Sequence, residues 1–277
     1  MSIAKDISFF EDWQQFLYEE YNYTMDKLNA TTLFWHYDKN NDLKKFRETG
    51  YHSYHLHYSK HLSKVKNDVK KILEIGVFKG HSMLLWQEYF PNAEIYGIDI
   101  DFSNKNFGQN AIDICKEHKR IHLEELDAYS VTNVEYIKQQ YGTDFDIIID
   151  DGSHHPAHQL FFILYYKELI KDNGYLIIED VFMENQFDKQ FLDYYDSSYK
   201  AFKNKKYFFD TILQTKTLKA LDYEIKGNKS INLDNYKIDI EKPVDYTLNF
   251  TNINLKRDST SKTYNNRQGI IFLKHKK

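Results

Sequence analysis

Short apolar runs alternate with helix-like segments between residues 70 and 180, and this alternation restricts the possible folds more than any other feature. Short runs that are almost entirely apolar are typical of strands buried on both faces of a parallel sheet. They lie at residues 71–76, 94–99, 121–126, 145–150 and 175–179. Helical patterns occur between them, at residues 82–90, 134–141 and 157–170. Repeated strand–helix–strand units have right-handed crossovers, so the pattern predicts a doubly wound, mostly parallel α/β sheet.

The two ends of the chain carry weaker patterns. Near the C-terminus, residues 268–274 predict a last strand, residues 207–213 a further strand of a seven-stranded sheet, and residues 185–202 a helix. Residues 214–266 are polar and have no clear period. At the N-terminus, apolar side chains recur at helical spacing, at Phe9, Phe10, Trp13, Phe16 and Leu17. We therefore expect a helical extension at residues 1–65 and one larger domain at residues 66–277.

The first predicted strand ends in the sequence Glu-Ile-Gly-Val-Phe-Lys-Gly, from Glu74 to Gly80. Glycines at a strand-to-helix turn let a ligand approach the backbone closely. Asp99 ends the next strand, where a carboxylate can hydrogen-bond a ribose diol. Together these features predict a nucleoside-containing cofactor, and an ordinary turn with a helix-capping acid is the alternative. The dinucleotide pattern G-x-G-x-x-G is absent, which argues against NAD.

Acidic residues follow the fourth and fifth predicted strands. The fourth strand runs into Asp-Asp-Gly-Ser-His-His-Pro at residues 150–156, and the fifth ends in Glu179 and Asp180. Parallel strands that are neighbours end at the same edge, so Asp151, Glu179 and Asp180 are expected to converge. Three close carboxylates repel one another unless a cation compensates, and a hard cation such as Mg²⁺ prefers oxygen ligands. The alternative is that one acid faces solvent and no metal binds.

Four segments in this order resemble the class I S-adenosylmethionine-dependent methyltransferases, which have a Rossmann-like fold. They are LEIGVFKGHSMLLW, YGIDID, DIIIDDGSHH and GYLIIEDV. Within that class they are most similar to the metal-dependent sugar O-methyltransferases, such as those that act on macrolide deoxysugars, and to the cephalosporin hydroxylase-like group. The resemblance extends over residues 70–182.

The resemblance implies roles for individual residues. Glu74, Gly76 and Gly80 match the turn beneath the methionine part of the cofactor, Asp99 the ribose contact and Asp127 the adenine contact. At Asp127 the chain departs from the family, which often has Gly before the acid, whereas Leu126 stands here. The whole expected cofactor-binding set is Glu74, Gly76, Val77, Gly80, Ser82, Asp99, Asp127 and Asp150.

The resemblance also assigns a metal site and a catalytic pair. Asp151, Glu179 and Asp180 match the metal ligands, and His154 matches the general base, with Asp151 counted as catalytic too. A metal that holds two sugar hydroxyls lowers the pKa of the attacking one, and an imidazole removes the proton. We expect His155 to lie on the helix surface, and His158 as well. The histidines at residues 52–61 either line a substrate pocket or lid, or form a structural cluster.

The expected activity is Mg²⁺-dependent O-methylation of a sugar hydroxyl in a capsule, a lipopolysaccharide or a natural product, with a small-molecule or sugar-nucleotide substrate. The alternatives are a catechol, amine or phosphate-linked acceptor, and, as a different class, an NAD-type oxidoreductase. A net charge of −4 gives no reason to expect nucleic-acid binding. No apolar run of membrane-spanning length and no signal-peptide core occur, which favours a cytoplasmic protein without membrane contact. The single cysteine, Cys115, is expected to be structural, and a homo-oligomer is left open.

Overall fold

The computed structural model of the chain describes residues 9, 10, 12, 33–37, 43–48, 54–103, 111–182, 217–219, 230–241, 249–250, 253–254 and 268–276. The helix expected at residues 185–202 and the strand expected at 207–213 lie outside these ranges. So do Trp13, Phe16 and Leu17, which belong to the apolar face expected near the N-terminus.

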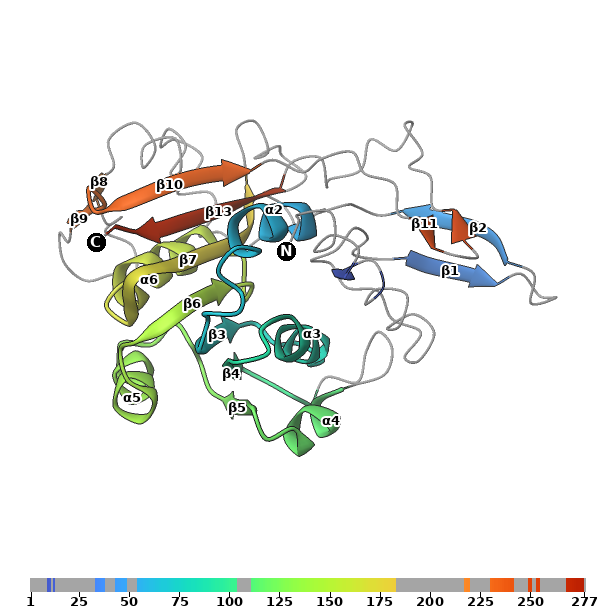
Figure 1. The fold of residues 1–277 in the computed structure, drawn as a ribbon, viewed down its shortest axis with the longest axis horizontal. Coiled ribbons are helices and arrows are strands. Elements are labelled where there is room, and N and C mark those ends of the chain that lie inside the picture. The colour runs from blue at the N-terminus through green and yellow to red at the C-terminus, as the bar shows by residue number, and fades with distance from the viewer. Residues whose placement is uncertain are drawn as a thin grey trace.

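A seven-stranded sheet forms the centre of the molecule, with the order β10-β13-β7-β6-β3-β4-β5 (Figure 1). Its strands are β3 (Lys71–Ile75), β4 (Glu94–Asp99), β5 (Ile121–Glu125), β6 (Phe145–Asp150), β7 (Ile170–Phe182), β10 (Tyr236–Glu241) and β13 (Gln268–His275). The pairs β3–β4, β4–β5, β3–β6 and β6–β7 are parallel, whereas β13 runs antiparallel to both of its neighbours. The mostly parallel α/β sheet is therefore confirmed.

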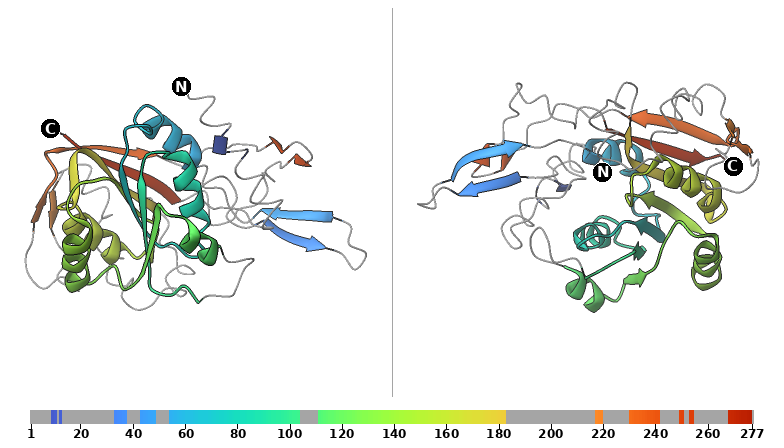
Figure 2. Two further views of the ribbon diagram at one scale, coloured as in Figure 1. Left: turned by 60° about the horizontal axis from the view of Figure 1, so that its bottom comes forward. Right: turned by 180° about the vertical axis from the view of Figure 1, so that it is seen from behind.

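Helices cover both faces of the sheet, as the doubly wound prediction requires (Figure 2). The helices α2 (Tyr54–Leu62), α3 (His81–Tyr89) and α4 (Ile112–Glu117) contribute to one apolar core. The helices α5 (Val131–Tyr141) and α6 (Pro156–Tyr166) contribute to the other. Each fully buried Leu, Ile or Phe in these cores stabilises the fold by roughly 1.5–3 kcal/mol. None of the helices in the described part of the chain has the length and hydropathy needed to cross a bilayer.

Two boundaries near residue 170 differ from the sequence prediction. The helix expected to reach residue 170 ends at Tyr166, and β7 begins at Ile170 rather than at Tyr175. Leu169 and Ile170 are both buried in the core, and an apolar run of this kind fits a helix end and a strand start equally well. The strand β10 was not expected, although its isoleucines alternate with charged residues, as is typical of a half-buried edge strand.

The expected N-terminal helical extension is not confirmed. Within it, β1 (Leu33–Tyr37) and β2 (Leu43–Glu48) form an antiparallel pair that lies apart from the large sheet in Figures 1 and 2. The helix α2, in contrast, packs into the core of the sheet, because Tyr58 and Leu62 are fully buried there. Two more short antiparallel pairs are formed by β8 (Thr217–Lys219) with β9 (Ser230–Asn232), and by β11 (Asn249–Phe250) with β12 (Ile253–Asn254).

Candidate active site

The carboxyl edge of the sheet has a topological switch point between β3 and β6. From β3 the chain continues through β4 and β5 toward one side, whereas β6 and β7 lie on the other side. In open α/β sheets, ligands bind outside the carboxyl ends of the strands at such a point. The predicted site residues lie at or near the carboxyl ends of these strands, at Gly76, Asp99, Asp127, Asp151 and Asp180. The fold therefore brings both halves of the predicted site to one edge.

Gly76 and the Asp151 backbone join the two halves at the switch point. Gly76 has a φ of 87°, and a Cβ on it would lie 2.1 Å from the Asp151 carbonyl oxygen. The Asp151 amide donates to the Ile75 carbonyl at 2.9 Å. Only glycine fits this close approach of backbone to backbone, so Gly76 fixes where the Asp151 loop begins.

Asp99 holds the turn that follows β3. Its Oδ2 accepts a hydrogen bond from the Phe78 amide at 2.6 Å, and its Oδ1 accepts one from the Asp101 amide at 3.2 Å. Phe78 has a φ of 50°, a conformation that the hydrogen bond helps to hold. Beside the carboxylate, Ile100 is 72% exposed and Phe78 38% exposed. The Asp99 carboxylate therefore fixes the turn after β3, where the sequence predicts the cofactor.

Three other members of the expected cofactor set are buried. Glu74 is fully buried and accepts a hydrogen bond from the Trp86 indole, and both Val77 and Ser82 are buried. Asp127, in contrast, is exposed; its Oδ1 accepts from the Tyr129 amide at 2.9 Å. Their assignment as cofactor contacts stays a prediction.

Gly80 and Cys115 pack together at the start of α3. Gly80 has a φ of 83°, and a Cβ on it would lie 2.9 Å from the Cys115 sulfur. The Cys115 thiol donates to the Gly80 carbonyl at 3.2 Å, and burial raises the pKa of that thiol to about 12. A thiol with so high a pKa is unreactive at neutral pH, which supports the structural role expected for Cys115.

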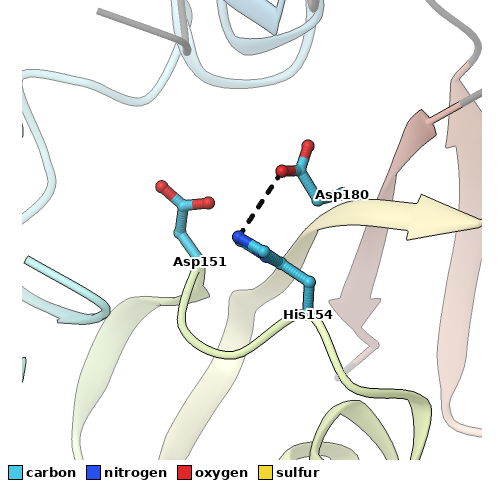
Figure 3. Close-up of side chains that lie close together, drawn as sticks. All are labelled: Asp151, His154 and Asp180. Carbon is cyan, nitrogen blue, oxygen red and sulfur yellow. Dashed lines mark ion pairs between the residues drawn. The ribbon is translucent and has the colours of Figure 1, made fainter. Parts of the chain in front are cut away.

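Asp151, His154 and Asp180 converge in the described part of the chain, with one potential ligand atom from each within 4.8 Å of the others (Figure 3). His154 Nε2 lies 3.6 Å from Asp180 Oδ2. His154 has a φ of 56° and Asp180 a φ of 53°, and each such backbone costs a non-glycine residue about 1–3 kcal/mol. Strained backbone at two members of one polar cluster is typical of a functional site. Two carboxylates and an imidazole can hold a divalent cation.

Glu179 is not part of this group. It is 1% exposed and accepts a hydrogen bond from the Tyr58 hydroxyl, while its backbone carbonyl accepts one from Gln159 at 3.1 Å. The expected convergence of three carboxylates is therefore found for Asp151 and Asp180, and the metal-ligand role of Glu179 stays a prediction.

Asp150 is a buried carboxylate beside the cluster. Tyr129 donates to its Oδ1 at 2.6 Å, whereas its Oδ2 has no hydrogen-bond partner among the described residues. Burial raises the pKa of Asp150 to about 6, although the Tyr129 hydrogen bond opposes the shift. The Tyr129 hydroxyl also accepts from the Ser153 amide at 3.2 Å, so one tyrosine fixes both Asp150 and the loop.

His158 is more constrained than a surface histidine. Its ring stacks on Tyr129 with centroids 4.2 Å apart, and its Nδ1 lies 2.7 Å from Ser153 Oγ. His158 is partly exposed and partly packed against the Tyr129 ring, so its expected position on the helix surface is found only in part.

Two tyrosines of α2 belong to the site and were not expected from the sequence. The Tyr54 hydroxyl donates to Asp180 Oδ1 at 2.8 Å and accepts from the Asp180 amide at 3.2 Å, and Tyr58 donates to Glu179. Burial, and then the charges of Asp180 and Glu179, raise the pKa of Tyr54 well above its ordinary value, so the hydroxyl keeps its proton. Their spacing of four residues, which places both on one helix face, was the available signal.

The neighbouring histidines of α2 face a different partner. His61 Nε2 lies 3.0 Å from Glu241 Oε1, and His57 Nδ1 lies 3.6 Å from Glu241 Oε2. These contacts join α2 to β10, which favours the structural alternative for His57 and His61.

Comparison with known proteins finds similarity to O-methyltransferases. The sequence model of the O-methyltransferase family matches residues 53–185. The L-olivosyl-oleandolide 3-O-methyltransferase of Streptomyces antibioticus is 30% identical over 140 residues, which cover 48% of this chain and 33% of the relative. The mycinamicin VI 2''-O-methyltransferase of Micromonospora griseorubida is 31% identical over 137 residues, which cover 47% and 32%. The chain thus spans about a third of the length of these curated relatives.

Among solved structures, the chain is similar to the MycE methyltransferase of the mycinamycin biosynthetic pathway, in complex with Mg, SAH and mycinamycin VI. The identity is 32%, the TM-score is 0.40, and the match covers 47% of this chain and 32% of that one. The family match starts just before α2, whereas the predicted domain boundary lies between residues 65 and 66, and that boundary stays a prediction. Through residues 53–185, the chain is similar to the O-methyltransferase family.

Proposed function

We propose that this chain transfers a methyl group from S-adenosylmethionine to a hydroxyl group of a sugar, with Mg²⁺ bound at the Asp151–Asp180 cluster. The observation that carries the proposal is the convergence of Asp151, His154 and Asp180 at the switch point of an O-methyltransferase sheet. The relatives are named for O-methylation of glycosylated natural products, which favours a sugar acceptor. A natural-product sugar is therefore the first class to test, before a capsule or lipopolysaccharide sugar.

The donor set of the cluster fits a hard divalent cation. Asp151 and Asp180 supply carboxylate oxygens, which are the ligands that Mg²⁺ prefers. Asp180 is 7% exposed, and a carboxylate so deeply placed is stabilised by a nearby cation. When bound there, Mg²⁺ would lower the pKa of a sugar hydroxyl and hold it in a fixed orientation. Glu179 stays a candidate for a third carboxylate ligand.

His154 is the proposed general base. An imidazole accepts a proton near neutral pH, and its Nε2 faces the cluster, 3.6 Å from Asp180 Oδ2. As the new bond between sugar oxygen and methyl carbon forms and the sulfur–methyl bond breaks, His154 would take the hydroxyl proton. The Asp180 carboxylate would then stabilise the imidazolium. In this proposal the Nε2 lone pair serves the proton and not the metal, since one lone pair cannot serve both.

The proposed cofactor site is the edge formed by the ends of β3, β4, β5 and β6. The residues that would hold S-adenosylmethionine are Glu74, Gly76, Val77, Gly80, Ser82, Asp99, Asp127 and Asp150. Asp99 Oδ2 accepts a hydrogen bond from the Phe78 amide, and Asp150 Oδ2 lies buried without a hydrogen-bond partner among the described residues. A buried carboxylate oxygen of this kind suits a ligand group that donates hydrogen bonds or carries positive charge. The cofactor, when bound, supplies the methyl group.

Calorimetry tests the cofactor directly. The purified protein is titrated with S-adenosylmethionine in Mg²⁺ and in EDTA, and then with NAD. Binding of S-adenosylmethionine without binding of NAD supports the proposal. No S-adenosylmethionine binding would overturn it.

An acceptor screen tests the chemistry. Macrolide glycosides and nucleotide sugars with vicinal hydroxyls are compared with a catechol and an amine, in Mg²⁺ and in EDTA. We expect turnover of a diol sugar that EDTA abolishes and that His154→Ala and Asp151→Asn each lower at least a hundredfold, since positioned proton transfer contributes about 10²–10⁴-fold. Asp113→Asn is the matched control, because the Asp113 side chain is 97% exposed on α4. Full turnover by both site variants would contradict the mechanism.

A further inference from the structure

The helix α2 places a tyrosine hydroxyl directly on one of the proposed metal ligands. Tyr54 is the first residue of α2 and is 1% exposed, and Asp180 lies near the end of β7, 126 residues later. Figure 1 shows α2 beside that end of β7. A helix outside the parallel strands therefore contributes to the site at the carboxyl edge.

Tyr54 contacts Asp180 at two atoms. Its hydroxyl donates to Asp180 Oδ1 at 2.8 Å and accepts from the Asp180 amide at 3.2 Å. The two bonds join side chain and backbone of the same residue, so they restrict both χ1 and φ of Asp180. They therefore help to hold the φ of 53°, which a non-glycine residue adopts only where surrounding contacts enforce it.

The two oxygens of Asp180 thus have different surroundings. Oδ1 accepts the Tyr54 hydrogen bond, whereas Oδ2 points toward His154 Nε2, 3.6 Å away, in the cluster with Asp151 (Figure 3). A hydrogen bond to one oxygen of a ligating carboxylate fixes the direction of the other. The orientation of Asp180 Oδ2 is therefore set from α2.

We propose that Tyr54 is a positioning residue, which holds Asp180 so that Oδ2 is presented to the divalent cation and to His154. The inference rests on the proposed Mg²⁺ site and adds a residue to it. Tyr54 itself touches neither the acceptor nor the cation. Its hydroxyl acts through Asp180, so its loss should weaken metal binding while leaving the S-adenosylmethionine site at β3 and β4 intact.

The test compares two buried tyrosines that both contact the α2–β7 region. Tyr54→Phe removes the hydroxyl from Asp180. Tyr175→Phe is the matched control, because Tyr175 lies on β7, is 7% exposed, and donates to the His61 carbonyl of α2 at 3.4 Å. Mg²⁺ affinity is measured by calorimetry, and Mn²⁺ replaces Mg²⁺ for a paramagnetic resonance spectrum of the bound ion. S-adenosylmethionine affinity is measured on the same samples.

We expect Tyr54→Phe to lower Mg²⁺ affinity roughly 10–100-fold, as the loss of a group behind a metal ligand does. Tyr175→Phe should bind Mg²⁺ like the unaltered protein, and both variants should keep their S-adenosylmethionine affinity. The Mn²⁺ spectrum should change only in Tyr54→Phe. In an Asp180→Asn background, Tyr54→Phe should have no further effect, because the two residues act as a unit.

Equal Mg²⁺ affinity in Tyr54→Phe and Tyr175→Phe would overturn the inference and leave the proposed function standing. If the unaltered protein binds S-adenosylmethionine but no divalent cation, the metal site and the role of Tyr54 both fail, while the methyltransferase assignment survives. If Tyr54→Phe does not fold, Tyr54→Gln replaces it. The glutamine side chain is polar but too short to reach Asp180 Oδ1 and the Asp180 amide. Unchanged Mg²⁺ affinity in that variant would equally overturn the inference.

Discussion

Gly76 and Asp151 lie so close that a Cβ on Gly76 would be 2.1 Å from the Asp151 carbonyl oxygen. The turn after β3 and the turn after β6 are thereby in backbone contact at the switch point of the sheet. The glycine expected to admit a cofactor is thus also required for a contact within the protein. Any change that separates these two turns moves the Asp151 carboxylate relative to Asp180.

Replacement of Gly76 tests that contact. A left-handed backbone costs a non-glycine residue about 1–3 kcal/mol. Gly76→Ala should lower the free energy of unfolding by more than this, because the new methyl group also overlaps the Asp151 backbone. Urea denaturation measures the loss, and a loss of no more than about 1–3 kcal/mol would show that the close approach has no energetic weight.

Tyr129 should stabilise the loop that carries the site. Tyr129→Phe removes the donor to buried Asp150 and the acceptor for the Ser153 amide, which should cost about 1–3 kcal/mol. Tyr136 lies on α5 and is 39% exposed, so Tyr136→Phe should lower the free energy of unfolding only slightly. Thermal and urea unfolding measure both. In an Asp150→Asn variant, Tyr129→Phe should lower the free energy of unfolding by less than it does in the unaltered protein. An equal loss in both would show that Tyr129 does not act through Asp150.

His81 should make the stability of the protein depend on pH. Burial, with a contribution from Lys79, lowers the pKa of His81 to about 4, whereas an unfolded histidine titrates near 6.5. Between these values the unfolded chain binds the extra proton, so the free energy of unfolding should fall as the pH drops from about 6.5 to 4. The full effect is about 3 kcal/mol.

Denaturation at several pH values measures this dependence. His81→Gln should flatten the loss of stability below pH 6.5. Parallel stability curves for His81→Gln and the unaltered protein would contradict the assignment.

Divalent cation should stabilise the folded chain through the Asp151–Asp180 cluster. A ligand that binds only the folded state adds about 2.7 kcal/mol at a hundredfold excess over its dissociation constant. Mg²⁺ should therefore raise the unfolding temperature, and EDTA should reverse the rise. Asp180→Asn should abolish the effect and Asp113→Asn should retain it, as scanning calorimetry can measure. A rise of the same size in Asp180→Asn would place the cation elsewhere.

The sheet could be predicted because its strands carry their own signal. Apolar runs such as residues 145–150 are buried from end to end, and the glycine and acid at Gly76 and Asp99 mark where strands end. Parallel strands end at one edge, so the closeness of Asp151 and Asp180 follows from strand order alone. The strand β10 carried a usable signal, because apolar and charged residues alternate along it, whereas its pairing with β13 is a long-range contact that no local pattern encodes.

The sequence by itself determined the doubly wound sheet and the edge at which the acidic residues and His154 gather, because strand periodicity and chain connectivity are local properties. Only the tertiary structure decided the direction of each side chain at that edge. Asp180 turns toward His154 because its backbone has a φ of 53°, whereas its neighbour Glu179 turns to Tyr58. Tyr54 and Tyr58 come from a helix 126 and 121 residues earlier in the chain. No periodicity encodes such a contact, since it exists only once α2 packs against β7.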